Sequence, residues 1–137
     1  MYQHEFKKRV RYGETDQMGY LYYGNYAQYY EIGRVEMLRS LGLTYRAMEE
    51  QGTMMPVMSM QCRYLRPVLY DQLITIRTTV RELPLNQIVF HMELYNEDQK
   101  LVNGGTVKLC FVDMNTRKTI PAPEYLVDKL APYFEKV

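Results

Sequence analysis

The sequence predicts an α+β fold in which one long helix packs against a single antiparallel sheet. From residue 24 to residue 41, apolar side chains recur at steps of three and four, which is the period of a helix. After Pro56, four segments have the composition of strands, and the turns between them suit antiparallel neighbours. A helix followed by a run of such strands indicates an α+β architecture.

The N-terminal region predicts a first strand over residues 5–12, with Phe6, Val10 and Tyr12 on one side of a period-two pattern. Residues 13–19 interrupt this pattern. Two glycines bracket polar side chains there, which is typical of a loop. We therefore expect a strand that leads through a loop into the long helix.

The long helix is expected to begin at Asn25, a residue type that caps helices, and to stop at Gly42. A helix of this length spans roughly 26 Å, enough to cross a whole sheet. Residues 44–51 predict a short second helix with Thr44 as its cap.

The four later strands are predicted over residues 57–66, 72–83, 86–96 and 100–113. Gly104 and Gly105, inside the last of them, predict a bulge or strong bend. Pro121 and Pro123 should end the sheet, and residues 124–131 predict one more short helix. The 137 residues suit one domain, so residues 1–137 are expected to form a single unit.

The charge balance and the distribution of apolar residues argue against several classes of protein. Seventeen basic and sixteen acidic residues give a net charge of +1, which offers no broad basic surface to nucleic acid. No apolar run approaches the roughly 20 residues of a membrane span. Residues 1–11 are charged and lack the apolar core of a signal peptide, so a cytoplasmic location is expected.

Few residues are candidates for chemistry. His4 and His91 form no metal-binding pair, and the motifs of nucleotide sites and serine hydrolases are absent from the sequence, so no metal or cofactor site is predicted. Asp16 remains, in a loop that leads to a helix N-terminus. Unpaired N–H groups there can hold the oxyanion of a thioester, and a carboxylate beside them can act as nucleophile or general base. The alternative is that Asp16 is a turn or capping residue.

Residues 11–19 (Arg-Tyr-Gly-Glu-Thr-Asp-Gln-Met-Gly), followed by residues 22–26 and by Tyr29, Tyr30 and Glu31, resemble the signature of the 4-hydroxybenzoyl-CoA thioesterase family. The likeness continues to Pro121 and so covers nearly the whole chain. It implies the hotdog fold, in which a curved antiparallel sheet wraps around a long central helix.

The resemblance also implies a site. Asp16 corresponds to the catalytic aspartate, and the backbone amide of Tyr23 to the group that polarises the thioester carbonyl. Gly24 and Asn25 complete the turn at the helix entrance, and Tyr22 is a further candidate for substrate binding. The substrate implied is an acyl-CoA, with CoA as part of the substrate rather than a separate cofactor. A homodimer or homotetramer with the site at a subunit interface is implied as well.

Two features depart from the family pattern. Many relatives carry a histidine in place of Tyr20 or Tyr23, so this chain must rely on Asp16 and water. Glu31 lies where another branch of hotdog enzymes places a catalytic glutamate, but it belongs to this family's own pattern and is interpreted as structural.

Several alternatives remain open from the sequence. A hotdog dehydratase would need a histidine paired with a carboxylate, and residues 7–89 contain no histidine. A non-catalytic module that binds acyl thioesters or acyl carriers is the alternative of another class. Four cationic side chains could bind the CoA phosphates, because a cation pairs with phosphate, or could be solvated surface charges. They are Arg63, Arg66, Lys108 and Lys118.

Overall fold

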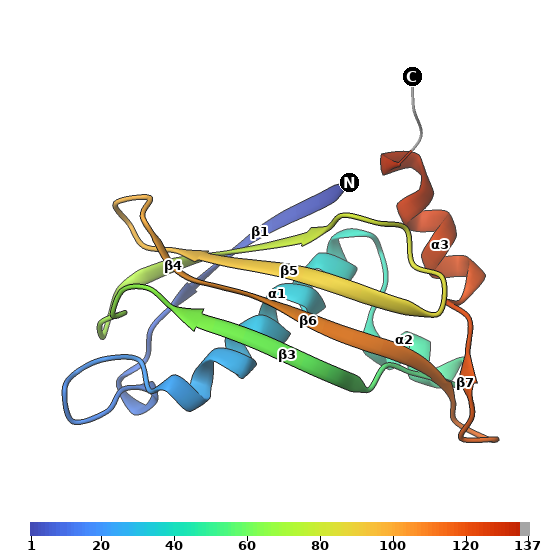
Figure 1. Ribbon diagram of the computed structural model, residues 1–137, viewed down its shortest axis with the longest axis horizontal. Coiled ribbons are helices and arrows are strands. Elements are labelled where there is room, and N and C mark those ends of the chain that lie inside the picture. The colour runs from blue at the N-terminus through green and yellow to red at the C-terminus, as the bar shows by residue number, and fades with distance from the viewer. Residues whose placement is uncertain (135–137) are drawn as a thin grey trace.

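The computed structural model describes residues 1–134 and places one long helix against a seven-stranded antiparallel sheet (Figure 1). The helices are α1 (Tyr26–Ser40), α2 (Tyr45–Glu50) and α3 (Glu124–Leu130). The strands are β1 (Tyr2–Arg9), β2 (Thr53–Met54), β3 (Val57–Tyr64), β4 (Leu73–Val80), β5 (Gln87–Tyr95), β6 (Leu101–Asp113) and β7 (Thr119–Ile120). Short 3-10 helices are η1 (Tyr12–Glu14), η2 (Tyr23–Asn25) and η3 (Ala131–Tyr133).

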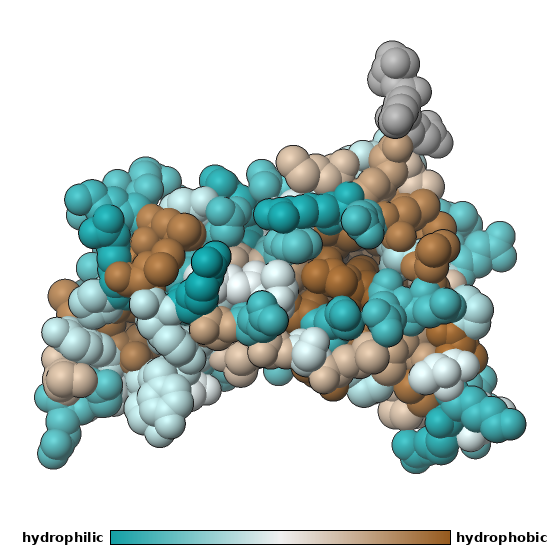
Figure 2. Space-filling model, viewed as in Figure 1, coloured by the Kyte–Doolittle hydropathy of each residue, from teal (hydrophilic) through white to brown (hydrophobic). Residues whose placement is uncertain are grey.

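The sheet has the order β1-β4-β5-β6-β2, and β3 and β7 also pair with β6. Along β4 and β5 the side chains that face α1 are buried, because every second residue of a strand points to the same side. The other face carries mostly hydrophilic side chains, with apolar patches between them (Figure 2). One face of the sheet therefore supplies the core, and the predicted α+β hotdog architecture is confirmed.

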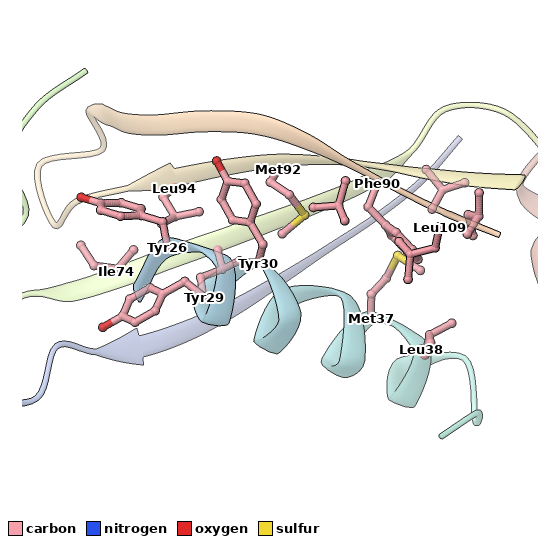
Figure 3. Packing of buried hydrophobic residues seen from close by; sticks show 14 of the residues in the cluster. Tyr26, Tyr29, Tyr30, Met37, Leu38, Ile74, Phe90, Met92, Leu94 and Leu109 are labelled. Carbon is pink, nitrogen blue, oxygen red and sulfur yellow. The ribbon is translucent and has the colours of Figure 1, made fainter. Parts of the chain in front are cut away.

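Helix α1 crosses the concave side of the sheet and packs against β1, β4 and β5 (Figure 1). Gly33 allows the close approach, because a Cβ at that position would lie 2.6 Å from Cγ2 of Ile76 and 2.6 Å from Oγ1 of Thr78. Tyr29, Tyr30 and Met37 point from the helix into the core without measurable exposure (Figure 3). Helix α1 therefore supplies a large part of the core.

The second helix also forms as predicted. The N–H of Ala47 donates a 3.0 Å hydrogen bond to Oγ1 of Thr44, the cap of α2. Helix α3 follows Pro123, close to its predicted start. The short strands β2 and β7 were not predicted, because two-residue pairings leave no periodic pattern in a sequence.

Two sequence predictions were wrong in part. The first strand ends at Arg9 rather than at residue 12, and Tyr12 begins η1 with 79% of its surface exposed. Gly104 and Gly105 form no bulge, since the pairing of β6 with both β3 and β5 runs through them without a shift of register. Asn25 occupies the cap position of α1 as predicted, although its side chain makes no capping hydrogen bond.

Candidate active site

Asp16 lies in a tight loop between β1 and α1. The backbone N–H of Asp16 donates a 2.8 Å hydrogen bond to the carbonyl of Tyr20, and the N–H of Gly19 donates to the carbonyl of Asp16 at 3.0 Å. Gly19 has a φ of +76°, a conformation that glycine adopts without strain. The loop is thereby closed on itself, and the position of Asp16 is fixed from within.

The two carboxylate oxygens of Asp16 have different surroundings. Oδ1 accepts hydrogen bonds from the N–H groups of Met18 at 2.9 Å and Tyr20 at 3.2 Å. Over residues 1–134, Oδ2 accepts none. The half-buried side chain is thus oriented through one oxygen, while the other is available to react.

The helix entrance supplies an N–H donor. Tyr22 has extended backbone (φ −62°, ψ 133°), and the chain then turns through η2 into α1. The N–H of Asn25 bonds to the carbonyl of Tyr22 at 2.9 Å, but the N–H of Tyr23 has no acceptor among the residues that the structure describes. An unpaired N–H at the start of a long helix carries partial positive charge and can bind an oxyanion.

A hollow of about 330 Å³ brings Asp16 and Tyr23 together. Apart from Asp16, Arg66 supplies the only charged side chain at its wall within residues 1–134. The remaining wall is apolar or aromatic and consists of Met18, Tyr20, Leu21, Tyr26, Tyr64, Leu65, Pro67 and Val68. A carboxylate, an N–H donor and an apolar cleft therefore occur in one place.

The connection from β3 to β4 forms one side of this hollow. The N–H of Leu21 donates a 2.6 Å hydrogen bond to the carbonyl of Val68, and Tyr20 forms an isolated bridge with Leu69. These contacts join the Asp16 loop to a segment 47 to 49 residues further along the chain. The opposite wall of the hollow is therefore hydrogen-bonded to the Asp16 loop.

Aromatic rings line the inner part of the hollow. Tyr26 is almost fully buried, and burial raises the pKa of its hydroxyl to about 12, so it is neutral at physiological pH. Its ring meets the ring of Tyr64 edge to face, with centroids 5.0 Å apart. Tyr64 is 51% exposed and also lies edge-on to Tyr23, at 6.5 Å. Tyr26, Tyr29 and Tyr30 all belong to the buried core, and Tyr26 contributes to the hollow as well.

The other predicted site residues support the helix entrance without lining the hollow, as far as residues 1–134 define it. The ring of Tyr22 packs on that of Tyr23, with centroids 4.9 Å apart. Gly24 leaves room for it, because a Cβ there would lie 2.7 Å from the Tyr22 ring. Nδ2 of Asn25 donates a 2.8 Å hydrogen bond to the carbonyl of Glu14.

Glu31 does not line the hollow within residues 1–134. Three of the four cationic candidates do not line it either: Arg63, Lys108 and Lys118. Met18, Leu65 and Val68 were not predicted as site residues from the sequence. In the segment of Leu65 and Val68, only Arg63 and Arg66 were named, as candidate cations for the CoA phosphates. No periodic pattern could have placed this segment opposite Asp16.

A second hollow, of about 620 Å³, lies at the β4–β5 connection and the outer face of β5. Its lining includes Arg81 and His91 and none of the predicted site residues.

Within residues 1–134, no group of three or more His, Cys, Asp and Glu side chains is placed to bind a metal ion. Nor is any helix in this range long and apolar enough to cross a membrane.

Comparison with known proteins assigns the chain to a family. The sequence profile of the thioesterase-like superfamily matches residues 10–130, which include the whole Asp16 loop and α1. The chain belongs to the thioesterase-like superfamily.

Individual members of the superfamily are similar over most of their length. YneP of Bacillus subtilis (strain 168) is 33% identical over 111 residues, covering 81% of this chain and 80% of that protein. The acyl-CoA thioesterase YbgC of Haemophilus influenzae is 30% identical over 120 residues, covering 87% and 88%. The crystal structure of the DHNA-CoA thioesterase from Staphylococcus aureus superposes with a TM-score of 0.87 at 29% identity, covering 100% of this chain and 98% of that one.

Proposed function

We propose that this protein hydrolyses an acyl-CoA thioester to a free acid and CoA. The observation that carries the proposal is that Asp16 and Tyr23 line one apolar hollow and that the Tyr23 N–H has no acceptor among the described residues. Membership of the thioesterase-like superfamily supports thioester hydrolysis as the reaction class. The names of the Haemophilus and Staphylococcus relatives support CoA thioesters as the substrate class.

In the proposed reaction the thioester oxygen accepts a hydrogen bond from the Tyr23 N–H at the positive end of α1. Oδ2 of Asp16 either attacks the carbonyl carbon or removes a proton from a water molecule that attacks it. The negative charge that develops on the oxygen is stabilised by the amide, and the C–S bond then breaks. Where Asp16 is the nucleophile, this leaves an acyl-aspartyl anhydride, and water cleaves it to release the acid and restore the carboxylate. Water supplies the hydroxyl group of the acid and the proton of the CoA thiol in both routes.

The wall of the hollow suits the two ends of such a substrate. The aromatic and apolar side chains, among them Tyr26 and Tyr64, offer a surface to an acyl group. Arg66 is the cation in the lining, and a guanidinium binds phosphate through paired N–H donors. Arg66 is therefore the proposed contact for the CoA phosphates, ahead of the three cations outside the hollow.

The proposal includes a homodimer as the basic assembly. Among the strands that the structure describes, β3 pairs with β6 alone, so its other edge is free. Along β3, Val57, Met58 and Met60 are 41–51% exposed, and Tyr64 is 51% exposed. A long, apolar, unpaired edge favours pairing with another chain. Because Tyr64 belongs both to this edge and to the hollow, a partner there would border the active site.

The test is replacement of Asp16 by asparagine, which keeps Oδ1 and its two backbone hydrogen bonds. We expect thiol release from acyl-CoA substrates to fall by at least about 100-fold, the lower end of what a general base contributes. Asp113→Asn is the matched control, because Oδ1 of Asp113 also accepts two backbone N–H groups, at 2.8 Å and 2.9 Å, but lies at the far end of β6. An Asp16→Asn protein that hydrolyses acyl-CoA as fast as the Asp113→Asn control would refute the mechanism.

The same assay addresses the alternative functions. A dehydratase would convert a 3-hydroxyacyl thioester to the enoyl product without releasing thiol, but neither His4 nor His91 lies at the hollow. A non-catalytic module would show CoA binding in a calorimetric titration. It would release no thiol from short, long or aromatic acyl-CoAs. Either result would replace hydrolysis as the function of this site.

A further inference from the structure

The carboxylate of Glu14, two residues before Asp16, connects three separate parts of the fold. Its Oε1 accepts hydrogen bonds from the Arg11 N–H at 2.8 Å, from Nζ of Lys8 at 3.1 Å and from the hydroxyl of Tyr29 at 2.8 Å. Lys8 lies on β1 and Tyr29 on α1. One side chain, only 16% exposed, thus fastens the Asp16 loop to the first strand and to the central helix.

The backbone carbonyl of Glu14 makes a second set of contacts. It accepts hydrogen bonds from the N–H of Tyr22 at 2.9 Å and from Nδ2 of Asn25 at 2.8 Å. Tyr22 and Asn25 flank the Tyr23 amide on both sides. Glu14 is therefore bonded to the oxyanion-binding turn through its main chain while its side chain is held by β1 and α1.

The charge of Glu14 is stabilised in this position. Burial raises the pKa of the carboxyl, but the hydrogen bonds from Arg11, Tyr29 and Lys8 and the charge of Lys8 outweigh burial and leave the pKa below its ordinary value. The Lys8 ammonium also lies 5.2 Å from the centre of the Tyr29 ring. Glu14 does not line the hollow over the described residues, so it has no direct access to a thioester there.

We propose that Glu14 is a positioning residue that sets the distance between the Asp16 carboxylate and the Tyr23 amide. The inference rests on the proposed function, because it assigns Asp16 and Tyr23 their roles. Both groups must lie close to the same carbonyl, and small errors in such a placement are costly. Hydrogen bonds inside the loop fix Asp16 relative to residues 18–20. Glu14 then ties this loop to β1, to α1 and to the turn that carries the Tyr23 amide.

Three variants test the proposal. For each one, kcat and KM are measured separately, and kcat is calculated per folded protein as determined by circular dichroism. Glu14→Ala removes every side-chain contact, and we expect kcat to fall about 10- to 100-fold while KM changes less than about 3-fold. Glu14→Gln keeps Oε1 and should recover most of this loss. Tyr29→Phe removes one donor and should lower kcat by a smaller factor. Glu5→Ala, which breaks the 2.8 Å pair with Arg77 between β1 and β4, is the surface control.

The outcomes separate positioning from other roles. Wild-type kcat in Glu14→Ala would overturn the proposal, and wild-type kcat in Tyr29→Phe would do so if Glu14→Ala does not fold. Glu14→Gln as inactive as Glu14→Ala would mean that the charge takes part in the chemistry, which also overturns it. Full activity of Asp16→Asn would refute the proposed function. An inactive Asp16→Asn beside a fully active Glu14→Ala would refute this inference alone.

Discussion

The hydroxyl of Tyr30, on α1, donates a hydrogen bond to Oδ1 of Asn103, on β6, and both residues are without measurable exposure. Nδ2 of Asn103 turns to Sγ of Cys62 on β3, at 3.2 Å. Burial raises the pKa of the Tyr30 hydroxyl far above its ordinary value, so this group remains a donor. A polar contact inside an apolar core fixes the rotation of the helix relative to the sheet, because any other rotation leaves these groups unpaired.

Tyr30→Phe should therefore destabilise the protein by about 1–3 kcal/mol, the cost of leaving a buried acceptor without its donor. The Tyr30→Phe/Asn103→Leu double variant removes both groups and should be more stable than Tyr30→Phe alone. Urea unfolding followed by circular dichroism measures both differences. Equal stability of wild type and Tyr30→Phe would mean that the contact makes no net contribution to the free energy of unfolding.

Two adjacent glycines of β6 should respond differently to alanine. A Cβ on Gly105 would overlap the carbonyl of Gln61 on β3 and lie 2.8 Å from the Tyr30 hydroxyl, whereas a Cβ on Gly104 would meet only the Met92 carbonyl, at 3.7 Å. Gly105→Ala should lower the free energy of unfolding by about 1–3 kcal/mol or more, the range for overpacked sites. Gly104→Ala should have a much smaller effect. Thermal unfolding of the two variants side by side tests this, and equal shifts would contradict it.

The fold was predictable because its main elements are long and periodic. Helix α1 keeps an apolar period over four turns, and β4 alternates clearly from Ile74 to Val80. The end of β1 was missed because the side chain at Lys8 faces inward to Glu14, so polarity does not mark the buried side there. The Gly104–Gly105 pair was read as a bulge, although Gly105 serves the close packing of β3 and Tyr30.

The site was predictable only in part. Asp16 and Tyr23 were named from a family resemblance and from the loop before the helix, and the structure places both at the hollow. Its other wall depends on the Leu21–Val68 hydrogen bond between distant loops. Such a pairing is set by tertiary structure, and local sequence patterns carry no information on it.

Stability should depend on the charge of Glu14 in acid. A carboxyl whose pKa is lower in the folded state contributes stability above its unfolded value, ordinarily 4.5, and loses it as the pH falls through the folded value. The difference in free energy of unfolding between wild type and Glu14→Gln should thus be largest near neutral pH and shrink below about pH 4.5. Urea titrations between about pH 3 and pH 7 measure it. A difference in free energy of unfolding that grows toward acid pH would contradict the prediction.

The role of the Tyr23 amide can be tested by proline. Tyr22 already has the extended backbone that precedes proline, and the first position of a helix accepts proline with loss of the N–H alone. Tyr23→Pro should lower kcat about 100- to 1000-fold, as expected for one oxyanion donor. Tyr23→Ala, which keeps the amide, serves as the control for the lost ring. If both variants have the same kcat, the amide does not bind the oxyanion.

The free edge of β3 predicts where a charge would separate the subunits. Met60 is 41% exposed on this edge, and Met60→Glu should weaken the proposed homodimer because it would place a carboxylate in an apolar contact. Leu85→Glu is the control, since Leu85 is 78% exposed in the β4–β5 connection, away from this edge. Light scattering during size-exclusion chromatography, over a range of concentrations, distinguishes monomer from dimer. If only Leu85→Glu dissociates the assembly, the contact lies at the β4–β5 connection and the proposed β3 interface is wrong.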